Sequence, residues 1–220
     1  RSNLMGGNRI KSMFGLHASF TVTNHTMERI AVELDGKESA FHIHMAEDRY
    51  DQHFTRHAYG TSVGERLSRW GLLGDRTICA HGVHLSDEEI ELLGESGTAV
   101  VHNPQSNMNN AVGTCDILKL QKSGVLVGLG TDAMTMNMLE EARAALWLQK
   151  SSRGEPSFPL DEITNMLLSG NQEITKRIWQ ESMGELSPNS LADIILIDYC
   201  SPTPLTSENY LGHLLFGMSQ

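Results

Sequence analysis

The stretch FHIHMAED, residues 41–48, carries the residue types from which a metal site or an acid–base pair is built. His42 and His44 flank an isoleucine, and Glu47 follows three positions later. On a β-strand, side chains alternate between faces, so both imidazoles would point to the same side. One interpretation makes His42 and His44 a ligand pair. The other makes His44 alone a ligand and Glu47, just past the strand end, a proton-transfer group.

Further polar residues of the same kinds end other apolar runs. They are His17, His81, His102 and Asp132. Each falls at or near the C-terminal end of a separate predicted strand. The predicted strands cover residues 12–18, 40–46, 76–82, 97–103 and 124–132.

Helical stretches separate these strands, at 26–35, 59–73, 86–97 and 115–124. Repeated strand–helix–strand units predict a parallel sheet with both faces covered. An open doubly wound sheet and part of a (β/α)₈ barrel both fit this pattern. No G-x-G-x-x-G or G-x-x-x-x-G-K-[ST] loop follows a strand, which weakens the nucleotide-binding sheet. The polar strand ends favour the barrel, because its strand ends converge on one rim.

Cap residues predict the ends of one helix, and a change in composition predicts a domain boundary. Ser86 precedes DEEIELL and predicts a helix start, and Gly94 and Gly97 predict its end. Helices are expected at 138–152, 160–169 and 171–182. The run 184–198 is rich in turn residues and then apolar, which predicts a β-strand. We therefore expect a partial barrel over 1–183 and the beginning of an accessory β domain, a sandwich strand, over 184–220.

Composition excludes some classes of protein. A net charge of −10 over 220 residues, with no basic run, argues against general nucleic-acid binding. The sequence contains no apolar run long enough to span a membrane. Its three cysteines are far apart and odd in number, which favours reduced thiols and a cytoplasmic location.

Four motifs in order, HIHMAE, CAHGVHL, HNPQSNM and GLGTDA, resemble the amidohydrolase superfamily over nearly the whole chain. Within it, the sequence is similar to aminohydrolases acting on guanine, cytosine, S-adenosylhomocysteine and chlorotriazines. GLHASFTV and HNPQSNMNNAVG most resemble an aminohydrolase linked to selenium metabolism. The resemblance implies a metal-dependent hydrolase on a TIM (β/α)₈ barrel. The first strand here would be the fourth of that barrel, so strands 1 to 3 and their H-x-H ligand pair are expected outside this sequence.

The resemblance also implies roles for individual residues. His44 would be the strand-5 metal ligand and Glu47 the carboxylate that shuttles protons. His81 would orient the attacking water or bind near the metal, and Asp132 would ligate the metal and accept a proton. His17 matches a position that contacts substrate. His42, one pleat deeper, would be a packed or hydrogen-bonded interior residue. Apart from the resemblance, His102 precedes an Asn-Pro pair and is expected either to contact substrate or to orient that turn.

The expected cofactor is one divalent metal ion, zinc first and iron as the alternative, since mixed His/Asp ligation suits both. MFGLHASF lacks the lysine or glutamate that bridges two metals in binuclear relatives. The expected reaction is hydrolysis of a C–N bond: deamination of a purine, pyrimidine or related small heterocycle. The alternatives are loss of an amide or chloride leaving group, or a non-catalytic relative if the upstream H-x-H is absent. A homodimer is the expected assembly.

Overall fold

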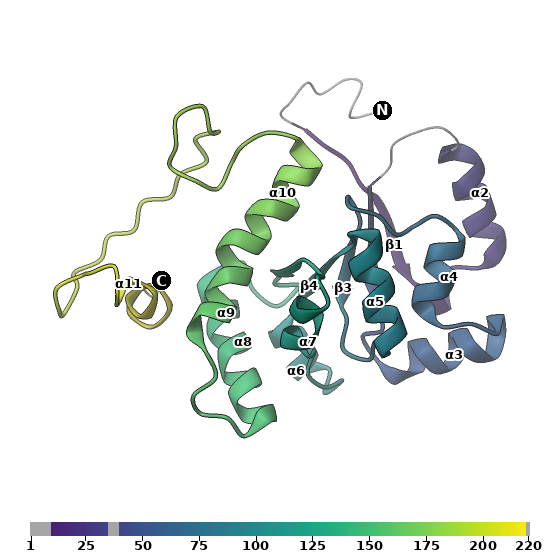
Figure 1. Ribbon diagram of the computed structural model, residues 1–220, viewed down its shortest axis with the longest axis horizontal. Coiled ribbons are helices and arrows are strands. Elements are labelled where there is room, and N and C mark those ends of the chain that lie inside the picture. The colour runs from purple at the N-terminus through teal and green to yellow at the C-terminus, as the bar shows by residue number, and fades with distance from the viewer. Residues whose placement is uncertain (1–9, 35–39, 219–220) are drawn as a thin grey trace.

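A computed structural model describes residues 10–34 and 40–218 of the chain. Its centre is a sheet of five parallel strands whose spatial order follows the sequence. The strands are β1 (Phe14–Ala18), β2 (Phe41–Met45), β3 (Ile78–His81), β4 (Ala99–His102) and β5 (Val127–Leu129). Figure 1 shows them in the middle of the molecule with helices around them. All five predicted strands are confirmed, each shorter than its predicted range.

A helix follows each strand, as the repeated unit requires. The helical elements are η2 (Ser19–Thr21), α2 (Asn24–Leu34), α3 (Arg49–Tyr59), α4 (Val63–Arg69), α5 (Asp87–Ser96), α6 (Pro104–Asn109), α7 (Ile117–Lys122), α8 (Met138–Arg153), α9 (Leu160–Asn165), η3 (Met166–Gly170), α10 (Asn171–Trp179), α11 (Tyr210–Gly212) and η4 (His213–Gly217). The short helix α6 and most of α3 had no counterpart among the predicted helices. The end of the predicted helix 26–35, Asp35, lies outside the described residues.

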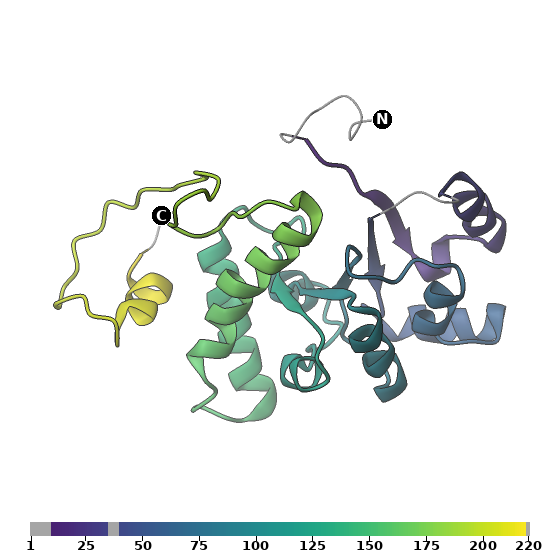
Figure 2. The ribbon, with the colours of Figure 1, turned by 45° about the horizontal axis from the view of Figure 1, so that its top comes forward.

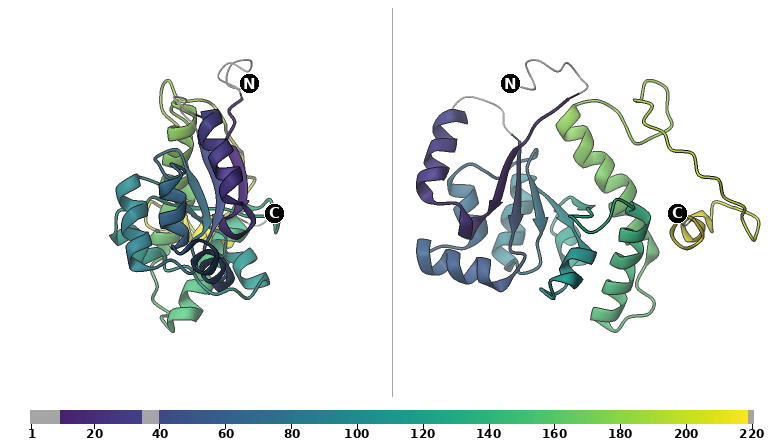
Figure 3. Two further views of the ribbon diagram at one scale, coloured as in Figure 1. Left: turned by 90° about the vertical axis from the view of Figure 1, so that its right-hand side faces the viewer. Right: turned by 180° about the vertical axis from the view of Figure 1, so that it is seen from behind.

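The apolar and the histidine side chains of β2 lie on opposite faces of the sheet. Ile43 and Met45 are 1% and 0% exposed and belong to the main core, between the sheet and its helices. His42 and His44 alternate with them and therefore point to the opposite face. In register, His44 lies beside Ala80 of β3. The views in Figure 3 show the strands running side by side with the helices packed around them.

Helix α5 begins after Ser86, as predicted, and ends at one of the two glycines that the sequence suggested. Ser86 and Glu89 form a capping box, and Gly97 closes the helix in a left-handed conformation with φ of 71°. The prediction that Gly94 also ends the helix is wrong. Gly94 lies inside α5. Glycine is required at this position because a Cβ atom would collide with the carbonyl oxygen of Ser123. This glycine permits close packing.

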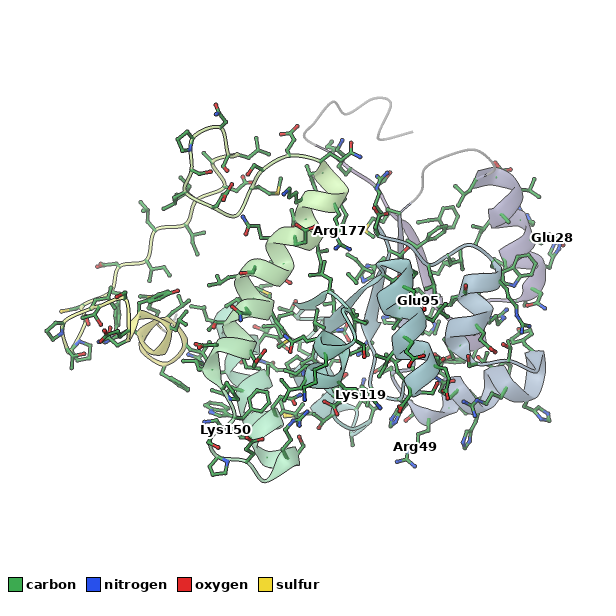
Figure 4. All side chains as sticks on the ribbon, viewed as in Figure 1. Glu28, Arg49, Glu95, Lys119, Lys150 and Arg177 are labelled. Atoms are coloured by element: carbon green, nitrogen blue, oxygen red, sulfur yellow. The ribbon has the colours of Figure 1, made fainter. Side chains whose placement is uncertain are left out.

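Helix α10 packs on β5 and on the beginning of β4. The amide of Asn171 accepts from Leu129 N–H at 2.9 Å and donates to Leu129 O at 3.0 Å, replacing a ladder partner on that strand. Ile174 and Ile178 pack on Ala99 in a second small core. Arg177, labelled in Figure 4, donates through Nη1 to Gly97 O at 2.8 Å and ties α10 to the end of α5.

The segment from 184 to 209 extends away from the sheet and its helices in Figures 1 and 2. The strand predicted within 184–198 is not formed: none of these residues is assigned to a strand. Ile195 and Leu196 are 82% and 95% exposed. A strand requires a neighbour for its backbone hydrogen bonds, and the described residues provide none here. An accessory β domain over 184–220 stays a prediction.

Candidate active site

The site lies where strands β2, β3 and β5 end. Three residues there, Ala46, His81 and Asp132, have positive φ angles of 50°, 77° and 50°. Residues other than glycine avoid this region because Cβ crowds the backbone, at a cost of roughly 1–2 kcal/mol each. Three such residues at the same edge of the sheet indicate that the fold holds the backbone in strained turns to aim side chains at a common point.

His44 presents one defined nitrogen to this point. Its Nδ1 donates to the backbone carbonyl oxygen of His17 at 2.8 Å. A carbonyl only accepts, so Nδ1 carries the proton and Nε2 retains its lone pair. The imidazole lies between two others, with ring centroids 5.2 Å from His17 and 5.3 Å from His81.

His81 is 1% exposed and stands between two carboxylates. Its Nε2 lies 3.7 Å from Glu47 Oε2 and 3.9 Å from Asp132 Oδ2. Neither separation is a hydrogen bond, and Nε2 has no hydrogen-bond partner among the described residues. Its other nitrogen, Nδ1, lies 2.8 Å from Asn107 Oδ1. Nε2 of His81 and the two carboxylates thus face one another without a hydrogen bond between them.

Each carboxylate is held by its own neighbours. The hydroxyl of Ser106 hydrogen-bonds Asp132 and, with Ala133 N–H and the nearby histidines, holds the pKa of Asp132 below its usual range. Asp132 is therefore a carboxylate at neutral pH. Asn110 Nδ2 donates to Glu47 Oε1 at 3.0 Å, leaving Oε2 directed at His81.

A buried carboxyl supports the turn before Glu47. Asp51, 3% exposed, accepts from Ala46 N–H at 3.0 Å and from Phe20 N–H at 3.3 Å. Burial raises the pKa of Asp51 to about 6 despite these two bonds. Asp51 thus joins the strained residue after β2 to η2, the helical turn that follows the strand carrying His17.

A pocket of about 250 Å³ opens on one side of these groups. Its lining residues are His17, Ala18, Phe20, His44, Glu47, Asp48, Tyr50, Asp51, Asn110 and Val112. Phe20 contacts His17 and Tyr50 edge-on, with ring centroids 5.9 and 5.3 Å apart. One wall is therefore aromatic, and the histidine and carboxylate groups form another, which suits a flat polar ring.

The structure brings together five of the predicted site residues: His17, His44, Glu47, His81 and Asp132. His102 is placed differently. It is 0% exposed, both of its ring nitrogens have no partner among the described residues, and burial lowers its pKa to about 3. It does not line the pocket. A substrate contact by His102 stays a prediction, and the structure places that imidazole in the interior as a neutral group.

His42 lies on the same face as His44, one pleat deeper, and its side chain is exposed in this chain.

The described residues include several candidate metal ligands but no ligating group. Within 10–34 and 40–218, no group of three or more His, Cys, Asp and Glu side chains stands in a ligating arrangement. The donors nevertheless match a zinc or iron site: a free Nε2 on His44, a partnerless buried Nε2 on His81, and an ionised Asp132. The ligand set His44, His81 and Asp132 stays a prediction.

Sequence reasoning missed the residues that hold these groups. Ser106, Asn107 and Asn110 all come from α6 and its end, and Asp51 comes from α3. The motif HNPQSNM pointed to the segment but not to the contacts. Alternation and spacing do not reveal which side chains of a short helix meet the ends of other strands.

The family model of the amidohydrolases matches residues 2–215. The chain belongs to the amidohydrolase family. Its sequence is 32% identical over 215 residues to the 5-methylthioadenosine/S-adenosylhomocysteine deaminase of Desulfitobacterium hafniense, covering 96% of this chain and 49% of that protein. It is 31% identical to the 5'-deoxyadenosine deaminase of Methanothermobacter thermautotrophicus, covering 98% of this chain and 51% of that protein.

Solved structures show the same fold. A zinc-bound adenosine deaminase from Xanthomonas campestris superposes with a TM-score of 0.79 at 26% identity, covering 93% of this chain and 47% of that one. Guanine deaminase from E. coli gives 0.81 at 20% identity, covering 93% and 50%. The amidohydrolase chain thus spans about half the length of the curated relatives it matches. The predicted fold, the C-terminal part of a metal-dependent-hydrolase barrel, is confirmed.

Among the described residues, none of the helices combines the length and apolar character that crossing a bilayer requires.

Proposed function

We propose that this chain supplies the acid–base part of the active site of a metal-dependent aminohydrolase that deaminates a purine-like heterocycle. The observation that carries the proposal is the arrangement around His81. Two carboxylates from different strand ends, Glu47 and Asp132, face the same buried imidazole nitrogen at 3.7 and 3.9 Å. Deamination needs one group to take a proton from water and another to protonate the ring.

The donor set supports a single zinc ion, with iron as the alternative. Zinc is coordinated in the adenosine deaminase from Xanthomonas campestris that shares this fold. In this chain, His44, His81 and Asp132 would contribute to the metal site, and further ligands would come from an H-x-H pair outside the sequence. A bound zinc ion would act as a Lewis acid and lower the pKa of water to about 7.

The residues of the chain then divide the proton work. Asp132, ionised because its pKa is lowered, would accept the proton of the attacking water. Glu47, oriented by Asn110, would carry a proton to the ring nitrogen or the leaving amine. The Nε2 of His81 lies between the two carboxylates, where its lone pair would orient the attacking water by accepting a hydrogen bond or would bind the metal.

The substrate class follows from the pocket and from the relatives. The edge-on pair Phe20 and Tyr50 offers an apolar wall to a flat ring, and His17 offers a polar contact beside it. The relatives are named as deaminases of 5-methylthioadenosine, S-adenosylhomocysteine and 5'-deoxyadenosine. We therefore place adenosine-type compounds first among the candidate substrates. A cytoplasmic location, a homodimeric assembly and the absence of nucleic-acid partners stay predictions.

The experiment measures ammonia release and metal content of the native protein and of two variants. Glu47→Gln should abolish ammonia release from 5'-deoxyadenosine or S-adenosylhomocysteine while zinc content stays at the wild-type level. Glu95→Gln, on the exposed surface of α5, is the matched control and should retain full activity. Unchanged turnover in Glu47→Gln would overturn the assignment of Glu47.

The same protein preparation also tests two alternative functions: hydrolysis of a chloride leaving group and a non-catalytic role. The zinc-bound atrazine chlorohydrolase from Arthrobacter aurescens shares the fold with a TM-score of 0.60 at 26% identity, covering 70% of this chain and 36% of that one. If the protein releases chloride from a chlorotriazine and releases no ammonia from nucleosides, its reaction is hydrolysis of a carbon–chlorine bond and not deamination. A native protein that binds no metal would favour a non-catalytic relative.

A further inference from the structure

Asn107 contacts His81 on the ring nitrogen that faces away from the two carboxylates. The side chains of both residues are buried, at 0% and 1% exposure, and Asn107 Oδ1 lies 2.8 Å from His81 Nδ1. The opposite nitrogen of the ring, Nε2, is the one that faces Glu47 and Asp132. In a neutral imidazole, the partner of one nitrogen decides whether the other carries the proton or the lone pair. Asn107 is therefore placed to decide what His81 presents to the site.

We propose that Asn107 is a positioning residue whose Oδ1 accepts the Nδ1–H of His81 and so keeps the lone pair of Nε2 directed into the site. The inference rests on the proposed function, in which Nε2 of His81 meets the reacting groups. It adds a residue that touches neither substrate nor metal. Its effect passes through the tautomer and orientation of a single imidazole.

The backbone makes this bond decisive. His81 has a φ of 77°, so its side chain leaves the strand end in a direction that the ladder alone does not fix. Cys79 and Ala80 pair with β4, whereas His81 has no partner in the β4 register and pairs only with Met45 of β2. With Nε2 unpartnered among the described residues, Asn107 provides the only hydrogen bond found there to this ring.

Asn107 stands on a support that is fixed independently. Helix α6 begins with Pro104 at its first turn, and Glu141 of α8 accepts from Gln105 N–H at 2.9 Å. The same short segment sends Ser106 to Asp132. It also sends Asn110 to Glu47. One six-residue helix and its following residue thus reach three chemical groups of the site, and Asn107 is the fully buried member.

A reversed amide would have the opposite effect. If Nδ2 of Asn107 donated to His81 Nδ1, the proton of the ring would lie on Nε2, and the site would face a donor in place of a lone pair. The two arrangements have nearly the same shape and differ in which amide atom of Asn107 faces the ring and in which ring nitrogen carries the proton. A measurement of the tautomer therefore decides between them without reference to turnover.

The first test is a two-bond ¹H–¹⁵N correlation spectrum of the native protein labelled with ¹⁵N-histidine, with metal removed by chelation. His81 is assigned by comparison with His81→Gln. The expected result is protonation at Nδ1. Protonation at Nε2 with a bare Nδ1 would overturn the proposal. This readout stands whether or not the protein deaminates anything.

The second test compares two substitutions. Asn107→Asp retains an oxygen acceptor and should retain protonation at Nδ1, whereas Asn107→Leu has a similar size and no acceptor and should lose it. In Asn107→Leu we expect kcat or zinc affinity to fall about 10–100-fold, with KM within about twofold of wild type. Wild-type kcat and zinc affinity in a folded Asn107→Leu would contradict the positioning role. If Asn107→Leu does not fold, the wild-type spectrum and Asn107→Asp still decide.

Discussion

Glu141 provides a prediction about stability that can be worked out from the structure. Its side chain is 0% exposed in the first turn of α8, Oε1 accepts from Gln105 N–H, and Oε2 has no partner among the described residues. Burial raises the pKa of Glu141 from 4.5 to about 7, with smaller contributions from the carboxylates of Glu140 and Asp132. At pH 8, the folded protein therefore holds a buried, half-satisfied charge.

The direction of the pH dependence follows from linkage. Because the folded-state pKa lies above the unfolded value, the folded protein binds more protons than the unfolded chain between pH 4.5 and 7. The contribution of Glu141 to the free energy of unfolding thus falls as pH rises through this window. At about 1.4 kcal/mol for each pH unit, the full loss is about 3 kcal/mol, and about 2–3 kcal/mol of it lies between pH 5 and pH 8.

Glu141→Gln removes this dependence because the amide is neutral at both pH values and its oxygen can still accept from Gln105. The free energy of unfolding is measured by urea denaturation of the metal-free native protein at pH 5 and pH 8. Relative to wild type, the variant should gain about 2–3 kcal/mol on going from pH 5 to pH 8. Any cost of the substitution that does not depend on pH cancels in this comparison.

The matched control is Glu140→Gln, which alters the exposed neighbour on the same helix and should change the comparison much less. An identical difference between Glu141→Gln and wild type at both pH values would refute the reasoning. That result would mean that Glu141 is hydrated or paired in solution, and that its burial does not govern its ionisation.

Two further substitutions test packing. Arg66 is 2% exposed and donates to the backbone oxygens of Ser19 and Val22 at 2.7 and 2.6 Å. Arg66→Met should therefore lower the free energy of unfolding by roughly 3 kcal/mol or more. A loss below about 1 kcal/mol would show that water replaces these hydrogen bonds. Gly170→Ala would bring a methyl group against Val127 O, and denaturant midpoints should show a loss of about 1–3 kcal/mol. Gly74→Ala meets nothing nearby and serves as its control; equal effects would contradict the contact.

Much of the fold could be predicted because its signals are local. Apolar runs alternating with helical stretches identified all five strands, and parallel pairing placed their polar ends at one edge. Ser86 was readable as a helix start because its capping box lies within four residues. The strand near Ile195 could not be judged in this way, because a strand depends on a neighbour that no local pattern specifies.

The sequence by itself determined which polar groups lie at the strand ends: His44, Glu47, His81 and Asp132 each stand at or just after the end of an apolar run. Only the tertiary structure decided how these groups are held. The contact of Asn107 with His81 spans 26 residues and that of Asn110 with Glu47 spans 63. Such contacts depend on the packing of α6 over the strand ends, which no pattern within a single element encodes.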